Sequence, residues 1–222
     1  MIRRLCTFGA YDPEYPRNLV IRRGLAALGV EVIECRVSPK LGSRARAREL
    51  ARLFTEVAAD CDAILLAEFN ASLAWLAGRL ARRSHMKLVI DPFVSFYNTA
   101  VHDRATAGRY SPAALYYWLL DALALHLPGL GAYPVLVDTA AHGAYFSHTF
   151  RVAPGRFFTV PVGAPREWLV QPDLSAGKSP LLVQFYGTYI PLHGIETILR
   201  AMALLREHSG LRFELIGHVQ TF

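Results

Sequence analysis

Short apolar runs alternate with longer amphipathic stretches along most of the chain. Six of these runs are typical of buried strands, and they cover residues 5–8, 30–35, 63–67, 88–90, 135–137 and 157–160. Between them, apolar residues at helical spacing predict helices over residues 18–28 and 45–59, and Pro112 is expected in the first turn of a third helix. This repeated alternation predicts a parallel sheet that helices cover on both faces.

The composition changes at residues 171–180, where turn-forming and small polar residues predominate, as is typical of a linker between domains. The pattern then restarts with a strand over 181–186, a loop that closes at Gly194, a helix over 195–207 and a strand over 212–216. We therefore predict a complete Rossmann-like domain over residues 1–173 and the start of a second one over 174–222. Because a single βαβ unit leaves a sheet edge and an apolar helix face unpaired, this second domain is expected to be truncated.

The composition, 53% hydrophobic and 19% charged, is that of a globular protein and excludes a disordered or fibrous chain. Cys6, Cys35 and Cys61 are widely spaced within apolar runs, which favours core thiols of a reducing compartment over disulfides or a metal site. The N-terminal apolar run is shorter than a signal-peptide core, and charged residues and prolines interrupt the most apolar stretch, residues 113–137. We therefore expect a cytoplasmic protein without a transmembrane helix.

A net charge of +6 favours anionic partners, but it does not choose among phosphates, a membrane surface and nucleic acid. Arg44, Arg48 and Arg52 recur every four residues and predict a solvated basic helix face. The alternative is peripheral contact with anionic lipid at the inner face of the membrane. Residues 116–118, Tyr-Tyr-Trp, lie in an otherwise apolar helix, for which a buried core position is predicted and an interfacial anchor is the alternative.

Several enzyme classes are disfavoured because their motifs are absent from the sequence. There is no GxxxxGKS/T phosphate loop, GxSxG nucleophile elbow, HExxH motif or GxGxxG motif. Residues 129–131, Gly-Leu-Gly, precede a predicted strand instead of following one, so they are not expected to bind a cofactor. The histidines show no metal-ligand spacing. We therefore predict neither a bound cofactor nor a metal site.

The segment that joins the two strands of the second unit is the most informative for chemistry. An apolar strand ends at Gly187, a loop turns through Pro191, and a helix begins at Gly194. Backbone N–H groups and the helix N-terminus then point at whatever lies over the strand end, which is how α/β folds hold a diphosphate. The alternative is an ordinary strand-to-helix loop in which the glycines only turn the chain.

Residues 187–199 resemble the opening of the nucleotide-sugar-binding domain of glycosyltransferase family 4 enzymes, which have the GT-B fold. Residues 9–18, 91–95, 138–142 and 160–164 are similar to successive landmarks of the acceptor-binding domain of that family, in the family's order. The resemblance implies two Rossmann-like domains, with the sugar donor mainly on the second and the acceptor mainly on the first. It also implies glycosyl transfer with retention of anomeric configuration and no catalytic metal, because helix N-termini and basic side chains hold the leaving diphosphate.

The resemblance also implies roles for individual residues. Donor contacts are expected at Gly187, Thr188, His193 and Gly194. Acceptor contacts are expected in the loop and helix start after the first strand, at Tyr11, Asp12, Tyr15, Arg17 and Asn18. His102 and Asp103 are expected beside the transferred sugar. The alternatives are that His102 is a surface loop residue and that Asp12 or Asn18 only caps its own helix.

Two positions depart from the family pattern. The family commonly has an arginine directly after the first glycine of the donor loop and a lysine directly before the second, where this chain has Thr188 and His193. Each charge-assisted phosphate contact contributes about 1.5–3 kcal/mol, so the loss of two is expected to weaken transition-state binding by roughly two to four powers of ten unless other cations substitute. The acidic motif that grips the ribose in the family is expected beyond the corresponding end of this chain.

The sequence thus predicts a glycosyltransferase that moves a sugar from a nucleotide-sugar donor to a glycan or lipid-linked acceptor. It also predicts that this chain alone is inactive and that a separate donor-half polypeptide is a partner. The alternative from another class is a non-catalytic module that binds a glycan or a partner protein, which the changes at Thr188 and His193 favour. Nucleic-acid binding rests on the net charge alone and is not expected.

Overall fold

The computed structural model describes residues 2–126, 133–169 and 180–219. Within these ranges the chain forms two α/β units, one with a six-stranded sheet and one with a two-stranded sheet. The predicted linker, up to residue 179, and the Gly-Leu-Gly segment at 129–131 lie outside the described residues.

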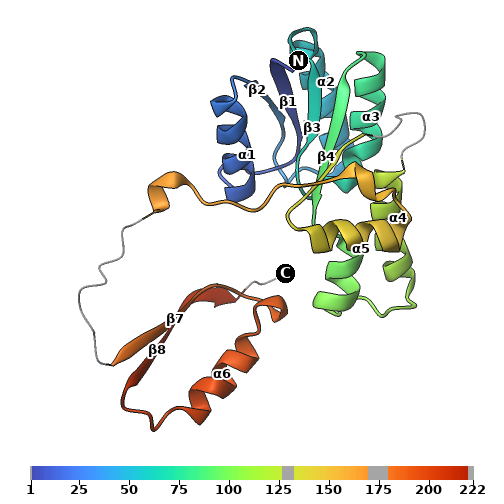
Figure 1. Ribbon diagram of the computed structural model, residues 1–222. Coiled ribbons are helices and arrows are strands. Elements are labelled where there is room, and N and C mark those ends of the chain that lie inside the picture. Colours follow the sequence, from blue (N-terminus) through green and yellow to red (C-terminus); the bar gives the residue numbers. More distant parts are fainter. Residues whose placement is uncertain (1, 127–132, 170–179, 220–222) are drawn as a thin grey trace.

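The larger unit is built on a parallel sheet of short strands (Figure 1). The strands are β1 Arg4–Gly9, β2 Glu31–Arg36, β3 Ala63–Leu66, β4 Lys87–Phe93, β5 Val135–Val137 and β6 Phe157–Thr159. Their order in the sheet is β2-β1-β3-β4-β5-β6, and every neighbouring pair is parallel. These strands coincide with the six predicted runs, so the prediction of a parallel α/β sheet is confirmed.

Helices connect the strands of this sheet. They are α1 Pro16–Ala27, α2 Ser43–Val57, α3 Ala74–Arg83, α4 Pro112–Leu125 and α5 Ala140–Phe150. The sequence pattern predicts α1, α2 and α4, but it misses α3 and α5 because their many alanines suit either face of a helix and blur the apolar period. A start signal for α5 does exist, since Thr139 caps it by accepting a hydrogen bond from His142 N at 3.2 Å.

Successive residues of a strand pack against different helices. Phe8 and Leu66 are paired in register and belong to the main core cluster, which α2, α3 and α5 cover. Leu5 and Leu65 belong to a smaller cluster together with Ile21 of α1. Burial of one such aliphatic or aromatic side chain contributes about 1.5–3 kcal/mol, so the two-sided cover explains why the central strand β3, in which every residue is buried, is wholly apolar.

The three cysteines are free thiols. Cys6 and Cys35 are buried, as predicted for core residues, whereas Cys61 is only partly buried. The hydrogen bond between the Cys6 and Cys35 thiols, together with burial, raises the pKa of Cys6 above its usual range. Cys6 is therefore an unreactive packing residue, because only the thiolate form is a good nucleophile.

The surface of the larger unit confirms one prediction about charge and corrects one about α4. Arg44, Arg48 and Arg52 are exposed on α2, as predicted for a solvated face. The prediction that residues 116–118 are buried is wrong for Tyr116, which is 60% exposed. The reason is that α4 buries only one side, which includes Ala114, Ala122 and Leu125. An interfacial role for its exposed side stays a prediction, and no described helix is long and apolar enough to cross a membrane.

The smaller unit consists of β7 Leu181–Tyr189, α6 Ile195–Leu204 and β8 Leu211–Val219, with the two strands parallel. This is the predicted single βαβ unit. None of its described residues, 180–219, is buried. The two-stranded sheet and α6 therefore form an α/β unit without a buried core among the described residues.

Candidate functional site

Parallel strands place their carboxyl ends along one edge of a sheet, which is where open α/β folds bind ligands. In the larger unit the segments that follow β1, β3, β4 and β5 meet at this edge (Figure 1). They bring together polar side chains that are almost fully buried: Arg17, Glu68, Asn70 and Asp91. Buried polar groups need partners, so the contacts of these residues define the candidate site.

The centre of the edge is a bidentate ion pair between Arg17 of α1 and Asp91 of β4. Arg17 Nε lies 2.6 Å from Asp91 Oδ2, Nη2 lies 2.9 Å from Oδ1, and the two side chains are 1% and 2% exposed. Arg17 Nη1 donates a further hydrogen bond to Val160 O, just after β6, at 3.0 Å. One guanidinium therefore joins α1 to the ends of two strands.

Burial raises the pKa of Asp91, and the two hydrogen bonds from Arg17 oppose that rise. Burial removes the hydration of both charged groups, and the attraction between Arg17 and Asp91 offsets this desolvation cost. The guanidinium of Arg17 is engaged on the inside of the edge and is not exposed to an acceptor. Arg17 therefore supports the site from within instead of lining it.

Asn70 ties the segment after β1 to the segment after β3. Its Oδ1 accepts a hydrogen bond from Ala10 N at 2.8 Å, and its Nδ2 donates to Glu68 O at 2.6 Å. The sequence carries no signal for this role, because the two ends of the Ala10 hydrogen bond are 60 positions apart.

Glu68, just beyond the end of β3, has an incomplete set of partners. Its Oε1 accepts a hydrogen bond from Asn18 Nδ2 at 2.7 Å, whereas Oε2 is buried and has no hydrogen-bond partner among the described residues. Asn18 Nδ2 also lies 2.7 Å from Asp12 O and so connects Glu68 to the loop after β1. Burial raises the pKa of Glu68, and the hydrogen bond from Asn18 opposes the rise.

We expect Glu68→Gln to stabilise the protein at pH 7 but not at pH 4. The folded-state pKa of Glu68 is raised above its unfolded value of about 4.3. Its contribution to stability is therefore complete below the unfolded pKa and is lost as the pH rises through the folded pKa. The amide does not ionise and therefore escapes this loss at pH 7.

Urea unfolding at the two pH values measures this effect. Glu207→Gln is the matched control, because the Glu207 side chain is 87% exposed, and its stability relative to the parent should be the same at both pH values. A Glu68→Gln variant with the same relative stability at pH 4 and pH 7 would contradict the prediction.

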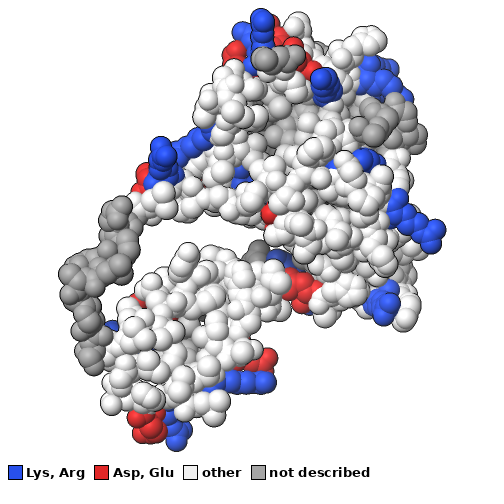
Figure 2. Space-filling view, in the orientation of Figure 1, with Lys and Arg blue, Asp and Glu red and all other residues white. Residues whose placement is uncertain are grey.

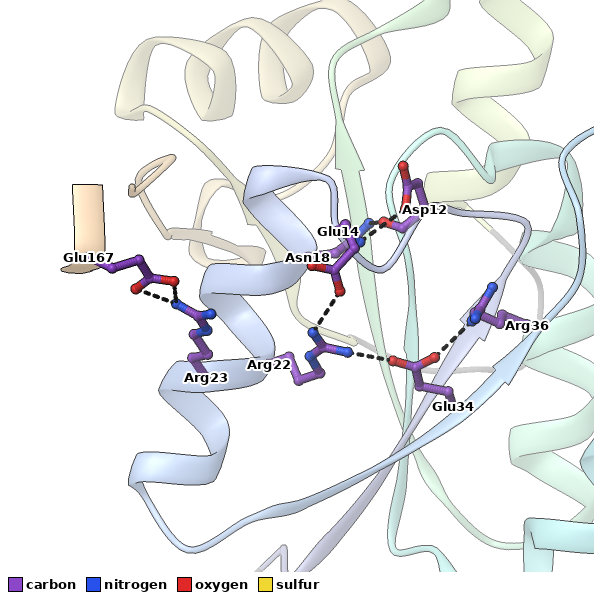
Figure 3. Close-up of polar contacts among 8 residues, drawn as sticks. All are labelled: Asp12, Glu14, Asn18, Arg22, Arg23, Glu34, Arg36 and Glu167. Carbon is purple, nitrogen blue, oxygen red and sulfur yellow. Dashed lines mark hydrogen bonds and ion pairs between the residues drawn. The ribbon is translucent and has the colours of Figure 1, made fainter. Parts of the chain in front are cut away.

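Surface ion pairs hold α1 and its preceding loop against the sheet (Figure 3). Arg22 bridges Glu14, at 3.2 Å, and Glu34 of β2, at 2.9 Å. Arg23 points away from these residues and contacts Glu167 at 2.6 Å. Each exposed pair contributes at most about 1 kcal/mol, but together they limit how far the loop can move.

Only part of the predicted acceptor set reaches the surface. Asp12 and Tyr15 are exposed, Asn18 is half-buried, and Tyr11 and Arg17 are buried. The position that caps α1 is Tyr15, and no side chain makes a capping hydrogen bond there, so neither Asp12 nor Asn18 caps this helix. Asp12 and Tyr15 are the two members placed to touch a ligand directly.

His102 and Asp103 lie in a short π-helix, Asn98–Asp103, between β4 and α4. The His102 ring packs edge-to-face on Tyr97, with ring centroids 5.6 Å apart, and Asp103 Oδ2 lies 3.9 Å from Arg104 Nε. Short π-helical turns occur frequently at functional sites. The expected role of His102 and Asp103 beside the transferred sugar stays a prediction.

Asp138 and His142 form another polar pair at the carboxyl edge. Asp138 follows β5, and its Oδ1 contacts Nδ1 of His142 in the first turn of α5. Because a carboxylate oxygen accepts, Nδ1 of His142 donates in this contact. The charge of Asp138 contributes to the raised pKa of Asp91, so this pair lies near the central ion pair.

The predicted donor residues lie around the end of β7 and the start of α6. β7 continues through Gly187 and Thr188 to Tyr189, beyond the predicted end at residue 186, because these residues pair with β8. His193 Nδ1 lies 2.6 Å from Thr188 O, and since a carbonyl only accepts, Nδ1 must carry the proton. Gly194, with φ 64°, begins α6 in the left-handed region that glycine tolerates best.

The start of α6 offers backbone donors but no cationic side chain. The first helical hydrogen bond runs from Ile198 N to Gly194 O, so the N–H groups of residues 195–197 have no acceptor within the helix. Residues 187–199 contain neither lysine nor arginine, and Glu196 adds a negative charge in the first turn, where it pairs with Arg200. Within residues 187–199, an anion at this end would therefore meet backbone N–H groups, His193 and threonine hydroxyls, but no lysine or arginine.

The overall fold is similar to those of solved glycosyltransferases. The structure of HepE from Anabaena with UDP and glucose aligns with 99% of this chain at a TM-score of 0.58 and 13% identity. A glycotransferase of kitacinnamycin aligns with 97% at a TM-score of 0.54 and 13% identity, and UGT89C1 of Arabidopsis thaliana with quercetin aligns with 99% at 0.52 and 12%. This chain spans 62%, 66% and 70% of their respective lengths.

These proteins are GT-B glycosyltransferases, so the chain has the α/β architecture of the GT-B fold, as predicted. At 12–13% identity the likeness concerns the fold alone. No protein-family model matches the sequence, and no curated protein matches it either. The narrower resemblance to family 4 stays a prediction from the sequence.

Proposed function

We propose that this chain supplies the acceptor-binding domain and the opening of the donor domain of a glycosyltransferase that uses a nucleotide sugar. The observation that carries the proposal is the GT-B architecture together with a polar carboxyl edge in the larger unit. In such a fold the acceptor lies over the edge of the first domain and the diphosphate of the donor lies over the first βα turn of the second.

On the acceptor side, the proposed contacts are those that face outward from the edge. Asp12 and Tyr15 are exposed, and His102, Asp103 and His142 lie on connections that follow β4 and β5. The buried ion pair of Arg17 and Asp91 would hold these connections in a fixed geometry. A fixed geometry matters because most of an enzyme's rate comes from correctly positioned groups and dipoles.

On the donor side, we propose that Gly187, Thr188, His193 and Gly194 surround the diphosphate, with backbone N–H groups of α6 as the main donors. Retention of configuration, independence from metal and a glycan or lipid-linked acceptor are parts of the proposal that rest on the sequence resemblance. A separate donor-half polypeptide is a further part of the proposal on the same basis.

We expect the 222-residue chain to bind UDP and UDP-glucose weakly, with dissociation constants above roughly 100 μM, and to show no sugar transfer by itself. The reason is that the phosphate loop has backbone donors but no adjacent arginine or lysine. Calorimetric titration and a donor-hydrolysis assay measure both outcomes. Submicromolar binding or clear turnover by this chain alone would show the prediction to be wrong.

A test variant and a matched control variant accompany this titration. His193→Arg places a cation beside the loop and should tighten UDP binding by about ten- to hundredfold, since a charge-assisted hydrogen bond contributes about 1.5–3 kcal/mol. His208→Arg adds the same charge on the turn after α6 and should leave the affinity within about twofold. Equal effects of the two variants would mean that UDP responds to net charge and not to the loop.

A second candidate is a non-catalytic module that binds a glycan or a partner protein through the same edge. The absence of cations from residues 187–199 and the acidic Glu196 favour it. If this candidate is right, the chain binds a glycan but neither the chain nor its His193→Arg variant binds UDP. The transferase requires UDP binding, so this result distinguishes the two candidates. Nucleic-acid binding has no further support, because Lys and Arg lie in separate small groups, several beside Asp or Glu, on the face shown in Figure 2.

A further inference from the structure

Three aromatic rings from separate segments converge at the carboxyl edge of the larger sheet. Tyr15 precedes α1, Phe69 lies three residues beyond the end of β3, and Phe93 ends β4. The ring centroids are 6.1 Å apart for Tyr15 and Phe69, 6.3 Å for Tyr15 and Phe93, and 5.5 Å for Phe69 and Phe93. All three pairs meet edge-to-face, the arrangement that aromatic rings prefer. We name these residues the ring cluster.

The ring cluster is kept at the surface although its rings are apolar. Tyr15 is 36% exposed and Phe69 is 43% exposed, while Phe93 is partly buried. An exposed phenylalanine that stands alone requires no explanation, but three rings in mutual contact at a ligand-binding edge form a shaped apolar surface.

Backbone strain presents two of the three rings. Phe69 has φ 58° and Phe93 has φ 61°, in the left-handed region that costs a residue with a side chain roughly 1–2 kcal/mol. The other described non-glycine residues with positive φ, His85, Ala105 and Arg151, lie one or two residues after the end of a helical segment, where a left-handed residue is an ordinary way to end a helix. Phe69 and Phe93 instead follow or end strands, where no such explanation applies.

Polar groups lie directly behind the rings. The Arg17 guanidinium carbon is 5.0 Å from the centroid of Phe93, within range of a cation–π contact. Burial, followed by the charge of Glu68, raises the pKa of Tyr15, which places the Glu68 carboxyl near that ring. The exposed Asp12 lies in the same turn as Tyr15, whose N–H donates to Asp12 O at 3.2 Å. Apolar ring surface with polar groups at its margin is the combination expected of a ligand site.

We propose that the ring cluster binds one sugar ring of the acceptor, through the C–H face of the sugar. This inference rests on the proposed function and names its acceptor chemistry. A pyranose has one face of C–H groups and a rim of hydroxyls, which matches an aromatic surface flanked by Asp12 and the Tyr15 hydroxyl. The strained backbone at Phe69 and Phe93 keeps the rings outward for this contact.

The test uses the 222-residue chain and saturation-transfer NMR with methyl α- and β-glucosides, galactosides and mannosides, and with cyclohexanol as an apolar probe of similar size. At least one glycoside is expected to receive saturation mainly at protons of one ring face, and cyclohexanol much less. Phe69→Ala is expected to weaken that binding about three- to tenfold, which corresponds to the worth of one aromatic contact. Phe69→Trp is expected to retain it.

Tyr110→Ala is the control, because Tyr110 is a highly exposed tyrosine just before α4 and belongs to no part of the ring cluster. It should leave glycoside binding unchanged. The proposal is overturned if no glycoside receives saturation, if cyclohexanol binds as well as the sugars do, or if Phe69→Ala and Tyr110→Ala have equal effects. UDP titration reports separately on the donor side, so UDP binding without glycoside binding refutes the ring cluster alone.

A stability measurement tests the backbone part of the proposal. Phe69→Gly and Phe69→Ala remove the same ring, but only glycine adopts the left-handed conformation without strain. Phe69→Gly is therefore expected to unfold about 2–4 °C above Phe69→Ala. If Phe69→Ala unfolds at a higher temperature than Phe69→Gly, the backbone at Phe69 is not strained, and strain does not explain the outward position of its ring.

Discussion

Replacement of Arg17 by methionine is expected to lower the free energy of unfolding by about 3–5 kcal/mol. The change leaves the carboxylate of Asp91, 2% exposed, without the partner that makes its burial tolerable. It also removes the hydrogen bond to Val160 O and so frees the end of β6 from α1. Urea unfolding followed by circular dichroism measures the loss, and the melting temperature should fall by roughly 10 °C.

A double variant separates the unpaired charge from the lost contact. Arg17→Met with Asp91→Leu removes both charges, and replacement of a buried ion pair by apolar side chains is often close to neutral. The double variant is therefore expected to be about 2 kcal/mol more stable than Arg17→Met. Arg22→Met, on the exposed side of the same helix, should change stability by less than about 1 kcal/mol. If Arg17→Met behaves like Arg22→Met, the buried pair does not anchor the edge.

Replacement of Gly9 by alanine is expected to cost roughly 3 kcal/mol. Gly9 ends β1 with φ 149°, and an added Cβ would lie 2.8 Å from Asn70 Nδ2 and 2.9 Å from Asn70 Cγ. Asn70 cannot retreat without giving up its hydrogen bonds to Ala10 and Glu68. The variant therefore adds backbone strain, a steric clash and the loss of a buried hydrogen bond.

Alanine substitutions at two other glycines, measured by the same unfolding experiment, separate the backbone strain at Gly9 from the steric clash with Asn70. Gly24, within α1, has an ordinary φ and open space where an added methyl group would lie, so Gly24→Ala should stabilise the protein by about 0.5–1 kcal/mol. Gly29 has φ 77° and open space, so Gly29→Ala should show the backbone cost alone. If Gly9→Ala costs no more than Gly29→Ala, the close approach of Asn70 has no energetic consequence.

The strand pattern was readable because it depends on local chemistry. Parallel strands that are covered on both faces are mostly apolar, so the predicted runs contrast with their polar surroundings, even though two glutamates interrupt the run over residues 30–35. The absence of lysine and arginine from residues 187–199 is also visible in the sequence, since it concerns residue types in one short segment. The prediction that Tyr116 is buried is wrong because the sequence of a helix that is apolar on all sides does not indicate which side packs against the rest of the protein.

The sequence by itself therefore determined the fold class, the single βαβ unit after residue 180 and the absence of lysine and arginine from residues 187–199. Only the tertiary structure decided which polar side chains share the carboxyl edge, because Arg17 and Asp91 are 74 positions apart and no local pattern links them. The convergence of the three aromatic side chains of the ring cluster was likewise visible only in the tertiary structure. Phenylalanine has no preference for the left-handed region, so the conformations of Phe69 and Phe93 arise from long-range packing that outweighs local preference.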